Sequence, residues 1–171
     1  MKLIDRCSRV VALLLWLSTL SSLTFTSALL EERFVDFSSS DDAISIHNAV
    51  IVHDGEDFIG IQIAAHSLVG DFEQITGKRP DNVTWDGDSG SLGNSSTAVL
   101  IGSIGSDLIQ TIVENGKIDV DDIEGKWETF KTSVVSEPLP GVRQALIIVG
   151  SDMRGTAFGV YTLAEQCGQS P

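Results

Sequence analysis

Cysteine is scarce in this chain of 171 residues. The two cysteines are Cys7 and Cys167, and Cys7 lies in an N-terminal segment that has the pattern of a cleaved signal. A lone remaining thiol cannot form an intrachain disulfide, so a disulfide-stapled fold is excluded. Apolar residues at helical spacing flank Cys167, which favours a buried, inert thiol over a nucleophile.

Basic side chains are scarce as well. Lysine and arginine together number 11 against 24 acidic residues, and the formal net charge is −13. A surface this acidic repels the phosphate backbone of nucleic acids. We therefore expect no nucleic-acid partner.

Long hydrophobic runs are also missing. The most apolar stretch, Val10 to Leu20, is shorter than the roughly 20 residues that span the hydrocarbon core of a bilayer. It follows a net-positive opening and precedes small residues that end at Ala28, which is the layout of a secretory signal. Residues 1–28 are thus predicted to be the cleaved signal of a secreted, extracellular protein. An uncleaved membrane anchor is the alternative, and stable membrane insertion is not expected.

The rest of the chain is long enough for one domain with its own core. Residues 29–43 are expected to form an N-terminal tether, and residues 44–171 a noncatalytic α/β domain. A barrel of eight β/α units needs about 200–250 residues. The chain is too short to contain such a barrel.

The hydrophobic pattern predicts strands and helices in the order β-β-α-β-α-β-β-α. Residues 44–53 favour extended structure with an interruption at His47-Asn48, and residues 58–75 carry one apolar stripe at helical spacing. Residues 81–97 are polar and indicate a surface loop. The apolar runs 98–103 and 145–149 are typical of strands that are covered on both faces.

Two serine–aspartate pairs mark the starts of the later helices. Ser106-Asp107 precedes a short helix that ends at Asn115-Gly116, and Ser151-Asp152 precedes the last helix. Residues 128–136 alternate in polarity and are expected to pair antiparallel with 145–149. The predicted fold class is therefore α/β, a mixed β-sheet with helices packed on it.

The sequence holds no pattern for a metal, a cofactor or a catalytic centre. His47, His53 and His66 lack the spacing of a zinc site, so structural histidines are the better interpretation. The turn Gly102-Ser103-Ile104-Gly105 lies where a helix could receive an anion, but the rest of a nucleotide-binding fingerprint is missing. A glycosidase needs two opposed carboxylates, which cannot be placed from sequence, and no Gly-x-Ser-x-Gly occurs. We predict no catalytic, metal-binding or cofactor-binding residue.

Two glycosylation sequons fit an exported protein. They are Asn82-Val83-Thr84 and Asn94-Ser95-Ser96, both within the predicted polar loop. Asn82 and Asn94 are the expected glycan acceptors, although triplets of this kind also arise by chance.

Several longer motifs occur in order over residues 45–170. They are Asp71-Phe72-Glu73-Gln74-Ile75-Thr76-Gly77-Lys78, Val99-Leu100-Ile101-Gly102, Lys117-Ile118-Asp119-Val120, Gly125-Lys126-Trp127-Glu128, Pro138-Leu139-Pro140-Gly141-Val142, and Ala145 to Gly159 with Tyr161, Glu165 and Gln166. This set resembles glycoside hydrolase family 115, whose members are secreted xylan α-1,2-glucuronidases. The resemblance covers only the family's first domain, a noncatalytic domain similar to those that precede the barrel in hexosaminidases and family 67 glucuronidases.

The resemblance implies an N-terminal ancillary domain of such a glucuronidase, truncated before the catalytic barrel. The family releases (4-O-methyl)glucuronic acid from glucuronoxylan, and its active-site residues belong to the barrel, so none is assigned here. The expected partners are the barrel of the parent enzyme and, in the full-length protein, xylan. We expect the chain alone to be inactive.

The last predicted helix supplies the candidate residues for docking to that barrel, namely Arg154, Gly155 and Gly159. A glycine inside a helix costs about 1 kcal/mol relative to alanine. Two of them four residues apart indicate that another backbone comes close, either the domain's own sheet or the barrel. Arg154 is either a salt-bridging residue at this joint or an exposed arginine.

An autonomous carbohydrate-binding or interaction module is the alternative function. Exposed aromatic side chains usually form sugar platforms, and the chain after its signal has two tryptophans. Trp85 lies between the sequons and is expected to be exposed, whereas Trp127 is expected to be packed. A small nucleotide-binding protein, based on the glycine turn at 102–105, is a third possibility.

Overall fold

The computed structural model describes residues 34–35, 43–87, 92 and 96–168. The predicted signal, most of the predicted tether, Asn94 and the last three residues lie outside these ranges. In chain order, the elements of the described residues are β1 (Val50–Asp54), α2 (Ile59–Thr76), β2 (Asn82–Trp85), β3 (Thr97–Ser103), α3 (Asp107–Glu114), β4 (Phe130–Ser136), β5 (Gln144–Gly150) and α4 (Met153–Gln166). No helix among them has the length and apolar character needed to cross a bilayer.

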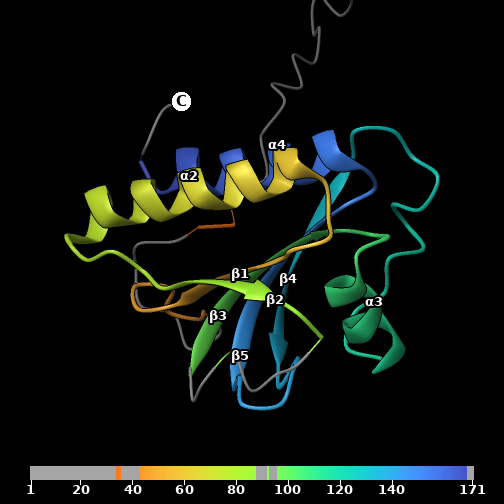
Figure 1. Cartoon of the computed structure of the whole chain (residues 1–171), viewed down its shortest axis with the longest axis horizontal. Helices are drawn as coiled ribbons and strands as arrows, with labels where there is room; N and C mark the ends of the chain where they lie inside the picture. Colours follow the sequence, from red (N-terminus) through yellow and green to blue (C-terminus); the bar gives the residue numbers. More distant parts are fainter. Residues whose placement is uncertain (1–33, 36–42, 88–91, 93–95, 169–171) are drawn as a thin grey trace, which may run out of the picture. The chain divides into compact units, whose positions relative to one another are not determined.

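The strands form one mixed sheet in the order β2-β1-β3-β5-β4 (Figure 1). β1 runs parallel to β2 and β3, and β3 runs parallel to β5. β4 pairs antiparallel with β5, as the sequence predicts. The predicted α/β class with a mixed sheet is confirmed.

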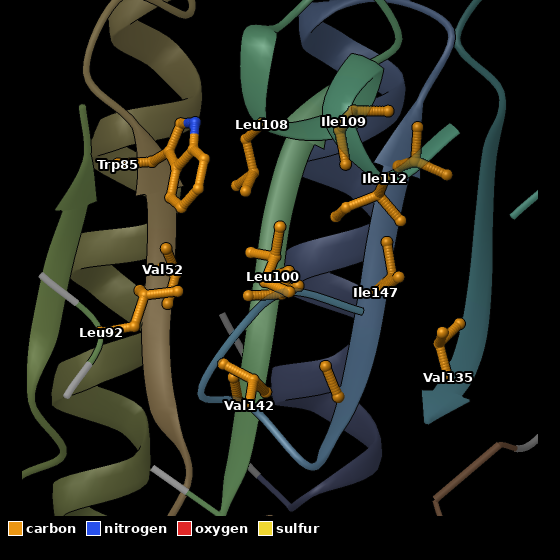
Figure 2. Close-up of a cluster of buried hydrophobic side chains, with 14 of the residues drawn as sticks. Val52, Trp85, Leu92, Leu100, Leu108, Ile109, Ile112, Val135, Val142 and Ile147 are labelled. Carbon is orange, nitrogen blue, oxygen red and sulfur yellow. The ribbon is translucent and has the colours of Figure 1, made fainter. Parts of the chain in front are cut away.

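Helices cover both faces of the sheet. α2 and α4 lie side by side on one face, and α3 packs on the other (Figure 1). The central strands β3 and β5 are buried on both faces, which explains their nearly continuous apolar sequences. In Figure 2, Val52, Leu100 and Ile147 point from neighbouring strands towards the side chains of α3.

The element order differs from the prediction at two places. Residues 44–46 form no strand; Ile44 and Ile46 are partly buried against the core on the α2 side, and β1 begins only at Val50. Residues 82–85, which the sequence assigned to a polar loop, form the edge strand β2. An edge strand pairs on one side only, so its exposed polar residues hide the strand signal.

Capping interactions close the helix ends, and α3 and α4 begin at the predicted serine–aspartate pairs. Gly77 ends α2 in the left-handed conformation, with φ 72°, and its N–H donates to the Glu73 carbonyl at 2.9 Å. The Ser106 side chain accepts from the Ile109 N–H, and the Asp152 carboxylate accepts from the Gly155 N–H at 2.8 Å.

Candidate functional site

The carboxyl ends of the parallel strands are the first place to look for a ligand site. β1 continues into α2 on one face of the sheet, and β3 continues into α3 on the other. In open α/β sheets, a crevice for ligands forms where neighbouring strands diverge in this way. The residues at this point are Asp54 and Asp57 after β1, and Ser103 to Ser106 after β3.

Asp57 occupies this crevice with its own carboxylate. The Ser103 backbone N–H donates to Asp57 Oδ2 at 2.7 Å, and the Ser103 hydroxyl donates to Asp57 Oδ1 at 2.8 Å. A bound phosphate would use such turn donors. The domain therefore fills the donor positions of this turn with a group of its own.

Asp54 closes the start of α3 in the same manner. Its Oδ2 accepts from the Leu108 N–H at 3.2 Å, and its Oδ1 accepts from the Glu56 N–H at 2.9 Å. A Cβ on Gly102 would lie 2.6 Å from Ser106 Oγ and 2.8 Å from the Ile109 side chain. Packing thus accounts for Gly102, the first glycine of the turn on which the nucleotide-binding hypothesis rests.

The three histidines occupy different environments. His47 and His66 are exposed, so the prediction of structural histidines is wrong for these two. His53 is buried, burial lowers its pKa, and its Nδ1 has no hydrogen-bond partner among the described residues. Within the described ranges, His, Cys, Asp and Glu side chains form no group of three or more that could hold a metal ion.

The exposed side of α2 and α4 carries large apolar residues. Ile59 and Ile63 project from α2, and Met153, Phe158 and Tyr161 project from α4. We call these five residues the α2–α4 apolar face. Ile63 is 57% exposed and Phe158 is 44% exposed, so both side chains are accessible to a partner.

The exposure of the two tryptophans is the reverse of what the sequence predicted. Trp85, expected to be exposed, is 5% exposed and packs in the core beside Leu108 (Figure 2), although its Nε1 finds no partner among the described residues. Trp127, expected to be packed, is 80% exposed. Trp85 lies at the end of β2, and pairing of this edge strand with β1 turns the indole into the core.

The two glycines of α4 are packed against the domain itself. A Cβ on Gly155 would lie 2.9 Å from the Thr129 backbone nitrogen, and one on Gly159 would lie 2.6 Å from the Ile148 side chain. Of the two close approaches considered from sequence, the structure has the one to the domain's own sheet. A role of these glycines in docking to a barrel stays a prediction.

Arg154 joins the start of α4 to the chain before β4. Its guanidinium forms an ion pair with Glu128 at 2.8 Å and lies 6.0 Å from the Phe158 ring centre. Both groups are partly exposed, so the pair contributes at most about 1 kcal/mol. The arginine borders the α2–α4 apolar face, where a docking role remains a prediction.

The remaining predicted residues are placed as follows. Asn82 is exposed at the start of β2, within reach of modification, whereas Asn94 lies outside the described residues.

Cys167 is half-buried after α4, and burial raises the pKa of its thiol. A raised pKa reduces the thiolate fraction and with it the reactivity.

A solved structure shares this fold. It is a family GH115 4-O-methyl-α-glucuronidase with specificity for decorated arabinogalactans, and the TM-score is 0.54 at 22% identity. The match covers 72% of this chain but only 14% of the glucuronidase chain. No protein-family model and no curated protein matches the sequence. At this identity the likeness shows a distant structural link, at the level of the fold alone.

Proposed function

We propose that this domain is the N-terminal, noncatalytic ancillary domain of a secreted xylan α-1,2-glucuronidase. The observation that carries the proposal is the fold shared with a small part of a GH115 glucuronidase chain. The motifs spread over residues 45–170 support the same family. In this proposal, hydrolysis takes place in another domain of the enzyme.

The chemistry of the strand ends supports a noncatalytic role. Inverting glycoside hydrolysis needs an acid and a base about 6.5–9.5 Å apart with a sugar and a water between them. Asp54 and Asp57 instead accept hydrogen bonds from the domain's own backbone. These carboxylates serve the packing of α2 and α3 rather than a substrate.

Two polysaccharides come into question as the substrate of the whole enzyme. The sequence motifs favour glucuronoxylan, whereas the structural neighbour is specific for decorated arabinogalactans. A uronic acid side group is the feature that we propose the enzyme recognises. Measuring the release of uronic acid from each polymer, by this domain together with a catalytic region, distinguishes the two substrates.

The α2–α4 apolar face is the surface that we propose docks to the catalytic domain. The test mixes this chain with a GH115 catalytic region from which the equivalent domain has been removed, and measures affinity by calorimetry. Ile63→Ser with Phe158→Ser should weaken binding by about tenfold or more, because both side chains would be buried at the joint. Val134→Ser is the matched control, since Val134 is 54% exposed but lies on β4. No binding, or an equal loss in the control, would contradict the docking surface.

Carbohydrate binding by the domain itself is the second candidate, and the exposed Trp127 favours it. Indole rings are common platforms for sugars, and Trp127 stands next to the Glu128–Arg154 ion pair. Titration with xylan fragments, followed by tryptophan fluorescence, separates the candidates. A saturable change that Trp127→Ala removes, without docking to a catalytic region, would favour the binding module.

We further propose export and glycosylation of the chain. The support is the sequence pattern of residues 1–28 and, for Asn82, its exposure. Expression in a secreting eukaryotic host should give a protein in the medium that begins at Leu29. Asn82→Gln and Asn94→Gln should each remove one glycan by mass spectrometry, and an unchanged mass would contradict the corresponding site.

A further inference from the structure

A groove of about 580 Å³ lies between the end of α3 and the turn that joins β4 to β5. Its walls include Asn115 and Lys117 after α3, and Glu137, Pro138 and Arg143 from the turn. The volume is within the usual range of about 300–1,000 Å³ for small-molecule sites. The groove shares no residue with the α2–α4 apolar face or with the strand-end crevice.

The turn that forms one wall is held rigidly. The Glu137 N–H donates to the Arg143 carbonyl at 2.8 Å, and the Val142 N–H donates to the Leu139 carbonyl at 3.1 Å. Leu139 and Val142 are anchored in the core beneath α3. A wall fixed in this way needs little ordering when a ligand binds.

Glu137 carries an unfavourable backbone conformation at the same place. Its φ is 52°, in the left-handed region that non-glycine residues seldom adopt. Backbone strain of this kind often accompanies binding sites, where the surrounding structure holds a side chain in position. Here it holds a carboxylate beside the groove.

The groove also gathers cations that lack carboxylate partners. Ion pairs within the described residues involve Arg79, Lys131 and Arg154, but neither Lys117 nor Arg143. Lys117 is oriented by a hydrogen bond from its Nζ to the Ser136 carbonyl at 3.4 Å. In a chain with a formal net charge of −13, this groove brings two cationic side chains, Lys117 and Arg143, beside one carboxylate, that of Glu137, so positive charge is in excess here.

We infer that the groove binds the carboxylate of a uronic acid borne by an oligosaccharide. Lys117 and Arg143 donate charge-assisted hydrogen bonds to the carboxylate. The Asn115 side-chain amide and the Glu137 carboxylate bind the hydroxyl groups of the sugar. The amide can donate or accept a hydrogen bond, and the carboxylate accepts. The inference rests on the proposed function for its choice of polysaccharide. It means that the ancillary domain binds uronic acid branches of the polysaccharide at a site separate from the catalytic centre.

The composition of the walls favours a sugar acid over other anions. Glu137 repels a doubly charged phosphate, whereas a sugar with one carboxylate supplies hydroxyl donors for it. An acidic peptide would place several negative charges near the same glutamate. A ligand with a single carboxylate and many hydroxyls can pair with Lys117 and Arg143 and can also donate hydrogen bonds to Glu137.

The test is calorimetric titration of the secreted chain with three probes. They are a 4-O-methylglucuronosyl xylo-oligosaccharide, the neutral xylo-oligosaccharide of the same length, and a glutamate-rich peptide. The acidic sugar should bind saturably, and the other two at least about tenfold more weakly. Lys117→Gln with Arg143→Gln should weaken binding of the acidic sugar by about tenfold or more.

A matched pair of substitutions controls for net charge. Lys78→Gln with Lys126→Gln removes the same charge, and neither residue lines this groove or pairs with a carboxylate in the described part of the chain. This pair should change affinity by less than about twofold. In the unmutated chain, amide NMR signals of Asn115 and Gly141 should shift with the acidic sugar.

Several results would overturn the inference. These are equal binding of the neutral sugar or the peptide, an equal loss in the charge control, or unchanged NMR signals at Asn115 and Gly141. Docking to the catalytic region is measured separately on the α2–α4 apolar face. A failure to bind uronate therefore does not contradict the proposed function, and a failure to dock does not contradict uronate binding in the groove.

Discussion

Replacing Gly155 with alanine tests how α4 packs on the sheet. The new Cβ would lie 2.9 Å from the Thr129 backbone nitrogen and carbonyl carbon, and closer still to the Thr129 oxygen. Backbone atoms cannot turn aside as a flexible side chain can, so α4 has to move. Overpacking costs about 1–3 kcal/mol, and a clash with backbone atoms belongs in the upper part of that range, about 2–3 kcal/mol, while alanine returns about 1 kcal/mol of helix propensity. We expect a net loss of about 1–2 kcal/mol in the free energy of unfolding.

Two other glycines calibrate this loss. A Cβ on Gly159 would meet the side chains of Ile148 and Phe130, which have some freedom to move, so Gly159→Ala should cost less than Gly155→Ala. A Cβ on Gly70, inside α2, would point into open space, so Gly70→Ala should stabilise the chain by about 0.5–1 kcal/mol.

Urea unfolding followed by circular dichroism measures all three variants. The expected order of stability is Gly70→Ala, the unmutated chain, Gly159→Ala and then Gly155→Ala. If Gly155→Ala is as stable as the unmutated chain, α4 does not approach the Thr129 backbone and the packing described above is wrong.

Three other local contacts give separate predictions. Asp57→Ala leaves the Ser103 N–H and hydroxyl without their acceptor and should cost about 1–3 kcal/mol in urea unfolding; an unchanged midpoint would refute the closed crevice. Burial lowers the pKa of His53 from 6.5, so the unfolded chain takes up a proton that the folded one resists, and stability should fall as pH drops below that value. His53→Leu should reduce this loss between about pH 7.5 and 5.5, whereas His47→Gln, at an exposed histidine that does not contribute to the His53 shift, should not. Because burial raises the pKa of Cys167, its thiol should react with Ellman's reagent more slowly in the folded chain than in urea, and equal rates would contradict its burial.

The parts of the fold that the sequence predicts depend on local signals. The apolar runs of β3 and β5 need no knowledge of distant residues, because such runs of β-branched and aliphatic residues are typical of strands covered on both faces. Ser106 and Asp152 likewise cap their helices through atoms only three residues away. Signals of this range can be recognised in a single sequence.

The features that the sequence misses depend on contacts between distant segments. β2 exists because residues 82–85 pair with β1, and the same pairing buries Trp85. Asp57 meets Ser103 across 46 positions, so nothing near either residue indicates their hydrogen bonds. The groove beside Arg143 arises in the same way, since its walls come from two separate loops.

Release of uronic acid is the measurement that tests the central claim most directly. The purified chain is incubated with glucuronoxylan and with a decorated arabinogalactan, alone and together with a separately supplied GH115 catalytic region. The account predicts no release by the chain alone, and release only when the catalytic region is present. Saturable release of 4-O-methylglucuronic acid by the chain by itself would contradict it.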